Sequence, residues 1–150
     1  MALSLQKLIA ALLASLGIIA GTNQTPVLTS PTTLPTATIS HKSGQVIVEL
    51  AKTPASQQQG LSDRKSLGPN QGMLFIFPQD EPHQFWMKDM NFPLDIIWLN
   101  KDGKILGIAT DVATSTFPNT IPSPGPIRQV LEVNAGYTQK YGLSIGDFIR

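Results

Sequence analysis

The sequence predicts a mostly β domain of the α+β class, a small barrel or sandwich of about seven short strands with two short helices at its periphery. Three features of the chain predict it. Short apolar or alternating runs recur and are separated by turn residues. Asp102-Gly103, a dipeptide typical of tight hairpins, lies between two of these runs. The two helical segments are brief, and each is followed by a glycine that can end it.

Strand signals occupy seven segments of the chain. The first, GQVIVELA, alternates, so that Val46 and Val48 are expected to face away from Ile47. The second, MLFIF, is a short apolar run stopped by Pro78 and is interpreted as a buried strand. In chain order the expected strands are 44–51, 73–77, 83–88, 93–99, 105–110, 127–133 and the end of 143–150.

Two segments carry the end signals of short helices. Thr53 is a suitable N-cap with Pro54 at the first helical position, and Gly60 ends the helix. In the second, Asn134 is the expected cap and Gly142 the terminator.

The segment from Asp111 to Pro126 is expected to be a long loop without sheet pairing. It contains four prolines and shows no periodicity. Long loops of this kind in compact domains are often functional or mobile.

The N-terminal part of the chain differs in composition from the rest. Residues 1–20 place Lys7 before an apolar run shorter than the roughly 20 residues of a membrane-spanning helix, which fits a signal peptide. If it is not cleaved, it could act as a marginal membrane anchor. Residues 21–43 are rich in Thr and Pro and are expected to be a disordered linker. The domain is then 44–150, exported to the periplasm or outside the cell, or tethered to the membrane by residues 1–20.

Charge and composition exclude several classes of function. Lys7 is the one charged residue before residue 41, so ten basic and ten acidic residues remain and the domain is formally neutral. This argues against a nucleic-acid partner, which requires a clustered basic face. The chain has no cysteine, and its two histidines form no ligand pattern, so no metal site and no cofactor are expected. The domain is expected to be a monomer.

Two charged residues, Lys88 and Asp95, lie within very apolar runs. A buried charge costs several kcal/mol unless it is paired or hydrogen-bonded. Lys88 is either a strand-end lysine whose head reaches water or a functional ammonium. Asp95 either accepts backbone N–H groups or pairs with Lys88. If 84–88 and 94–98 pair, a one-residue change of register decides whether both charges share a face.

Three further residues complete the candidates for ligand binding. Arg64, in a turn-rich loop, could bind a ligand or form a structural ion pair with Glu132 or Asp95. Lys88 and Asp95 are predicted to share one polar cluster with Arg64 or Glu132. Trp86 and Trp98 are expected in the core, with Trp86 also considered as a ligand platform.

The order of short motifs resembles the DUF192 family (domain of unknown function 192). The resemblance covers essentially all of 44–150 and departs from the family pattern at Asp89-Met90, where the family has Asn-Thr. It implies a compact β-rich domain, often exported, and no established reaction. The matching positions are Gly72, Met73, Leu74 and Phe75; Phe85, Trp86, Met87 and Lys88; Pro93, Leu94 and Asp95; Leu131, Glu132, Ala135 and Gly136; and Gly146 with Asp147.

Two functions remain open from the sequence. The first is a non-enzymatic binding or accessory module at the cell envelope, with a small molecule or an envelope component as its partner. The alternative is a small envelope hydrolase, or a related enzyme, that uses Lys88, Asp95 and Arg64 in a cleft covered by 111–126. The two differ in whether those three side chains converge on one open concavity.

Overall fold

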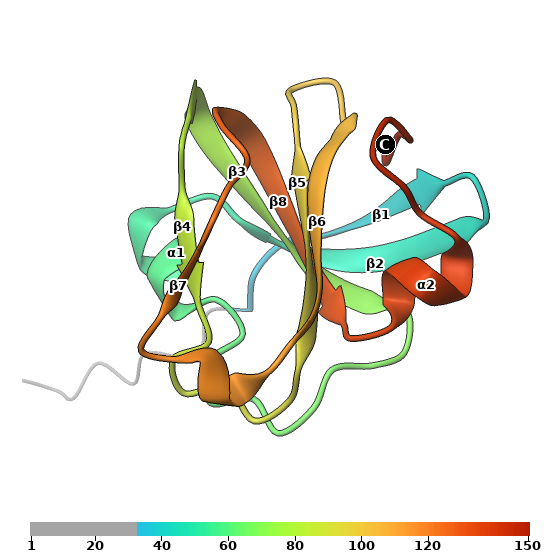
Figure 1. The fold of residues 1–150 in the computed structure, drawn as a ribbon. Coiled ribbons are helices and arrows are strands. Elements are labelled where there is room, and N and C mark those ends of the chain that lie inside the picture. The colour runs from blue at the N-terminus through green and yellow to red at the C-terminus, as the bar shows by residue number, and fades with distance from the viewer. Residues whose placement is uncertain (1–32) are drawn as a thin grey trace, which may run out of the picture. The chain divides into compact units, whose positions relative to one another are not determined.

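A strongly twisted six-stranded sheet organises residues 33–150, the part of the chain that the computed structural model describes (Figure 1). The strand order is β1-β2-β3-β8-β5-β6. The pairing is antiparallel except between β2 and β3. The strands are β1 (Thr36–His41), β2 (Gly44–Ala51), β3 (Gln71–Glu81), β8 (Ile127–Asn134), β5 (Leu94–Leu99) and β6 (Ile105–Val112).

Smaller elements cover the two faces of this sheet. On one side lie the helix α1 (Pro54–Gln59) and a two-stranded ribbon of β4 (Gln84–Trp86) and β7 (Thr120–Pro122); on the other lie the helix α2 (Tyr137–Tyr141) and the C-terminal segment (Figure 1). A short 3-10 turn, η2 (Thr114–Thr116), leads into β7. The arrangement confirms the predicted mostly β class in its sandwich form. Within 33–150 the sheet is not closed into a barrel, because β1 and β6 are its edges.

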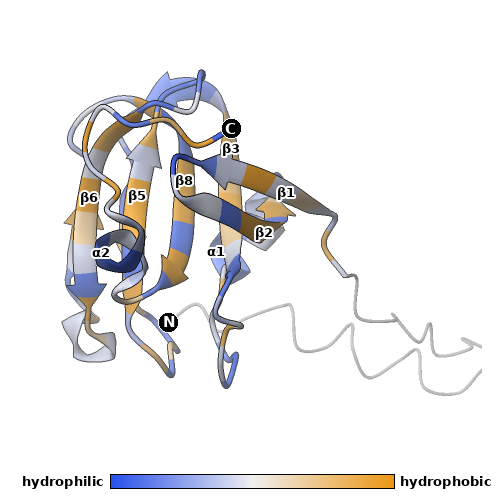
Figure 2. Ribbon diagram, turned by 90° about the vertical axis from the view of Figure 1, so that its right-hand side faces the viewer, coloured by the Kyte–Doolittle hydropathy of each residue, from blue (hydrophilic) through white to orange (hydrophobic). Residues whose placement is uncertain are grey.

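Each face of the sheet supports its own hydrophobic core. The ribbon-side core contains Phe75, Phe85, Ile96, Trp98 and Val130; the helix-side core contains Val46, Val48, Ile97, Leu131 and Tyr137. Alternation along β8 divides its side chains between them, as expected for a strand of period two. Figure 2 shows the hydrophobic residues concentrated along the strands of the sheet, with hydrophilic ones on α1 and α2.

The parallel pair β2–β3 requires a crossover, and α1 provides it. Its cap was predicted correctly: Thr53 accepts a hydrogen bond from the backbone N–H of Ser56, and the Ser56 side chain lies within hydrogen-bonding distance of the Thr53 backbone N–H. The side chain of Gln57 donates to the carbonyl oxygens of Ala51 and Ile76, which ties α1 to both strands of the parallel pair.

Glycine is required where β3 approaches β8. A Cβ atom on Gly72 would lie 2.7 Å from the carbonyl oxygen of Glu132 and 3.0 Å from a methyl carbon of Val133. Backbone atoms cannot move away without breaking the ladder. The glycine that opens the Gly-Met-Leu-Phe motif is therefore explained by close strand packing.

Several predicted boundaries are wrong. The linker was placed at 21–43, but β1 occupies Thr36–His41, so folded structure begins before residue 44. Its polar Thr and Ser residues conceal a strand whose inward side chains, Ala37 and Ile39, pack against the helix-side core. The expected strand at the chain end is reduced to one bridge, between Phe148 and Lys104.

Three other expectations also require correction. β3 does not stop at Pro78 but continues to Glu81, past an irregularity in its pairing with β8. The 111–126 segment was expected to carry no pairing, but β7 within it pairs with β4. Asn134 does not cap α2; it ends β8, and its side-chain amide donates to the carbonyl oxygens of Leu67 and Gly68.

The predicted signal peptide, 1–20, and the linker up to residue 32 lie outside the described residues. Across 33–150, no helix combines the length and apolar character needed to cross a membrane.

Removal of β1 tests its contribution to the domain. The unfolding free energy of a chain that begins at Gly44 should be at least about 2 kcal/mol lower than that of a chain that begins at Thr33. It loses the edge pairing, the packing of Ile39, and the hydrogen bond of 2.9 Å between His41 and Tyr137. Urea denaturation followed by tryptophan fluorescence measures the difference. Equal unfolding free energies would show that β1 adds nothing to the fold.

Candidate functional site

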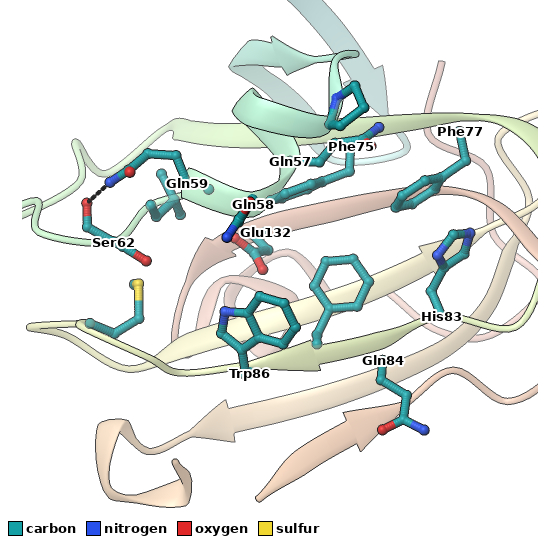
Figure 3. A pocket seen from close by; sticks show the side chains of 15 residues that line it. Gln57, Gln58, Gln59, Ser62, Phe75, Phe77, His83, Gln84, Trp86 and Glu132 are labelled. Atoms are coloured by element: carbon teal, nitrogen blue, oxygen red, sulfur yellow. Dashed lines mark hydrogen bonds between the residues drawn. The ribbon is translucent and has the colours of Figure 1, made fainter. Parts of the chain in front are cut away.

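A pocket of about 370 Å³ opens on the ribbon side of the sheet, between α1, β3 and β4 (Figure 3). One wall consists of α1 and the turn that follows it, including Gln58 and Ser62. The hydrogen bonds from Gln57 to Ala51 and Ile76 hold that wall against the sheet. Most of the residues that line the pocket therefore belong to regular secondary structure, and the others to the turns beside it.

Aromatic side chains form most of the remaining surface of the pocket. Phe75 and Phe77 alternate along β3 and point to the same side (Figure 3). Phe85 meets Phe75 edge to face at a centroid distance of 5.3 Å, and the His83 ring stacks on Phe77 at 3.6 Å. Trp86 remains 43% exposed although it lines the pocket, which makes it an accessible aromatic surface.

Glu132 supplies the one carboxyl group among the residues of 33–150 that line the pocket. It lies in β8 opposite Met73 on one neighbouring strand and Ile96 on the other, and its side chain points into the pocket (Figure 3). The residue is only 5% exposed, and burial raises the pKa of its carboxyl to about 8. Burial is the only influence on this pKa: within residues 33–150 no group donates a hydrogen bond to the Glu132 carboxyl and no cation pairs with it.

His83 is the other titratable side chain of the lining. Burial lowers its pKa, and this outweighs the opposing influence of Glu81, whose carboxylate lies 3.9 Å from Nε2. The imidazole is therefore neutral at pH 7. Its Nε2 is buried and has no hydrogen-bond partner among the described residues.

Of the sequence-predicted candidates, the structure brings Trp86 and Glu132 together in this pocket. Lys88 lies outside it: its side chain is 58% exposed, as expected for a strand-end lysine, and its ammonium is 4.0 Å from Asp89. Arg64 pairs with Glu49 through two nitrogens, the Nη2–Oε2 distance being 2.8 Å, and the hydrogen bond lowers the pKa of Glu49.

Asp95 lies on the opposite face of the sheet, fully buried. One carboxylate oxygen accepts from the backbone N–H groups of Asp111 and Gly136, and the other accepts from the N–H and the hydroxyl of Thr138. Asp111 has a φ of 50° at an irregularity in the β5–β6 pairing. Asp95 thus joins β6 to the start of α2.

The predicted polar cluster of Lys88 and Asp95 with Arg64 or Glu132 is therefore wrong. Strand β4 pairs with β7 and not with β5, so neither of the two registers considered for Lys88 and Asp95 exists. Asp95 and Lys88 line two separate pockets, and the Arg64 side chain is paired with Glu49.

Trp86 and Trp98 were both expected in the core. Trp98 is buried there, with 5% of its surface exposed, whereas Trp86 is not. Sequence reasoning missed Phe75, Phe77, His83 and the α1 wall. The Phe-x-Phe spacing in a predicted strand could have indicated that the two rings share a face. No pattern in the sequence indicated that β4 would lie across them. Among residues 33–150, no group of three or more His, Asp or Glu side chains could hold a metal ion.

Comparison with known proteins identifies relatives of unknown function. The sequence model of the DUF192 family, described as "Uncharacterized ACR", matches residues 36–150. A crystal structure from Sinorhizobium meliloti 1021, described as a candidate transcription regulator, is 32% identical, with a TM-score of 0.76 over 81% of this chain and 97% of that one. A protein of unknown function from Novosphingobium aromaticivorans DSM 12444 is 33% identical, with a TM-score of 0.69 over 81% and 89%. No curated protein matches.

Replacement of Glu132 by Gln should flatten the pH dependence of stability. Between the ordinary carboxyl pKa of 4.5 and the folded value of about 8, the folded state binds more protons than the unfolded state. Its unfolding free energy therefore falls as pH rises through this window, by up to about 1.4 kcal/mol per pH unit. Urea denaturation of wild type and Glu132→Gln at pH 5, 6, 7 and 8 measures the two slopes.

The control for this comparison is Asp102→Asn, an exposed change in the hairpin turn that preserves a favourable turn dipeptide. It should follow the wild-type slope. An unchanged slope in Glu132→Gln would contradict the assignment of the buried proton to this residue.

Asp95→Asn should lower the unfolding free energy by at least about 2 kcal/mol, because an amide nitrogen would face N–H donors that are then left unsatisfied. The matched control is Asp111→Asn. Asp111 is exposed and contributes only its backbone N–H to the network, and Asn tolerates its positive φ. Denaturation midpoints at pH 7 separate the two variants; a loss as large in Asp111→Asn would contradict the role given to the Asp95 carboxylate.

Proposed function

The chain belongs to the DUF192 family, and we propose that this member is a non-enzymatic, exported binding module that holds a small organic molecule in the aromatic pocket beside Glu132. The observation that carries the proposal is the combination of a preformed apolar concavity with a buried carboxyl that has no partner among residues 33–150. Small-molecule sites typically join apolar and aromatic walls of about 300–1,000 Å³ to a few polar groups that fix orientation.

The pocket is suited to binding without large rearrangement. Its walls belong to α1, β3, β4 and β8, and the Gln57 hydrogen bonds connect the helix to the sheet. A site that is ordered before the ligand arrives avoids the entropic cost of ordering it on binding.

Binding is preferred over the enzyme alternative for a geometric reason. The hydrolase hypothesis requires Lys88, Asp95 and Arg64 in one cleft. Lys88 instead reaches solvent, and Arg64 is engaged by Glu49. Asp95 is consumed by four hydrogen bonds on the far face of the sheet.

Two further considerations concern location and partner class. The export of the domain rests on the signal-like residues 1–20, and the cell envelope is the compartment that we propose on that basis.

The description as a regulator of transcription belongs to the Sinorhizobium protein. This domain is formally neutral and so gains no net attraction to DNA phosphates, which is why that role is not carried over.

A thermal-shift screen of small apolar and aromatic compounds tests the proposal. A compound present at 100 times its dissociation constant should raise the unfolding free energy by about 2.7 kcal/mol. Trp86→Ala should weaken every such compound at least about fivefold, since it removes an accessible aromatic wall. The change should leave the fold intact because Trp86 is half-exposed.

The matched control is Phe148→Ala, an aromatic side chain of similar exposure, 42%, that does not line the pocket. It should retain wild-type binding. Compounds whose stabilisation is reduced equally by both changes, or by neither, would place binding outside this pocket and defeat the proposal.

A further inference from the structure

Resting on the small-molecule site proposed above, we infer that its ligand carries a positive charge: an organic ammonium ion whose apolar body lies among the aromatic side chains and whose N–H groups donate to the Glu132 carboxylate. Three features of the pocket support this class of ligand. They are the buried carboxyl of Glu132, the aromatic walls and, among the described residues of the lining, the lack of a lysine or arginine.

The Glu132 carboxyl has neither a hydrogen-bond donor nor a cation as partner among residues 33–150. Its neighbours across the sheet are Met73 and Ile96, neither of which can donate a hydrogen bond from its side chain. A buried carboxylate is tolerated in proteins when a cation or several donors compensate for its lost hydration. Asp95 meets this requirement within the domain, and Glu132 does not. A ligand ammonium supplies both the charge and the donors.

The walls of the pocket are largely aromatic, and aromatic rings attract cations. Phe75, Phe85 and Trp86 line the same cavity as the carboxyl. The face of an aromatic ring is negative, and cations are attracted to it at distances up to about 6 Å, most strongly for Trp. A site with several rings around one carboxyl thus favours a cation through two independent interactions.

Among the described residues of the lining, no cationic side chain competes with a ligand cation for the Glu132 carboxyl. The described residues that line the cavity, from α1, β3, β4, β8 and their turns, include no lysine and no arginine. His83 is the other titratable group of the lining, and burial lowers its pKa so that it is neutral at pH 7. An anionic ligand would find no positive partner there and would face the Glu132 carboxyl.

Proton release follows from this mode of binding. Burial raises the pKa of Glu132 to about 8, so the empty pocket holds a protonated carboxyl at pH 7. When the ammonium binds, the carboxyl loses that proton to solvent and becomes the anionic partner, while the amine keeps its own proton. Each binding event near pH 7 should therefore release about one proton, and progressively fewer as the pH rises from 7 through 8.

Calorimetric titration of the full chain with 2-phenylethylamine and 2-phenylethanol at pH 7 tests the inference. The two probes share an aromatic body and differ in the charged end. The amine should bind at least about tenfold more tightly than the alcohol. Glu132→Gln should abolish this preference, while Asp102→Asn should keep it.

Repeating the titration in buffers of different ionisation enthalpy measures proton release. About one proton per amine should appear with the wild type and none with Glu132→Gln. The wild-type result alone decides this part if the variant does not fold.

The outcomes separate the inference from the function on which it rests. If both probes bind with equal affinity, and both lose affinity in Trp86→Ala, the small-molecule site stands and the ammonium inference is overturned. A preference for the amine that persists in Glu132→Gln, or amine binding without proton release, also overturns it. If neither probe binds, or if Trp86→Ala changes nothing, both the inference and the proposed function fall.

Discussion

Burial of the central sheet on both faces is the constraint on which the arrangement of this domain depends. Every residue of β5 is buried, and β8 contributes side chains to both cores. Water cannot solvate a polar side chain on either face, so each one needs a specific solution. The covering elements provide these solutions: α2 and the β6 irregularity on one face, and an open pocket beside α1 on the other.

Asp95 and Glu132 show how differently two carboxyl groups can be accommodated on adjacent strands. Asp95 pairs in register with Val133, so the two acidic residues are near neighbours in the sheet but face opposite ways. Asp95 receives three backbone N–H groups and a hydroxyl. Glu132 receives none from residues 33–150 and faces the pocket beside α1. The same functional group therefore connects structural elements in one case and, in the other, lines a pocket without a partner among the described residues.

The sequence predicted the elements whose signals are local, and it missed those that depend on distant partners. Alternation identified β2, and the Asp102-Gly103 turn identified the β5–β6 hairpin, because those patterns are complete within a few residues. The edge strand β1 resembles a linker, since only one of its faces is partly buried and its other residues are polar.

The candidate functional site shows the same contrast between residues with a local signal and contacts that depend on distant partners. Glu132 was among the candidates as a possible partner of Arg64, and Trp86 as a possible ligand platform. Their meeting in one pocket depends on β4 crossing the ribbon-side core, which only the β4–β7 pairing determines. The partners of Asp95 lie far along the chain, in β6 and at the start of α2, and no spacing rule connects residues so distant.

The position of Glu132 near the end of the chain has a consequence for when the pocket can work during synthesis. The aromatic and α1 walls come from segments made early, whereas the carboxyl arrives with β8, which inserts between β3 and β5. Pairings between such distant segments form slowly, because a long loop must close first. A chain still emerging from the ribosome or a translocation channel, with β8 not yet in place, has no complete pocket. The proposed ligand could then bind only to the finished domain, after β8 has paired with β3 and β5.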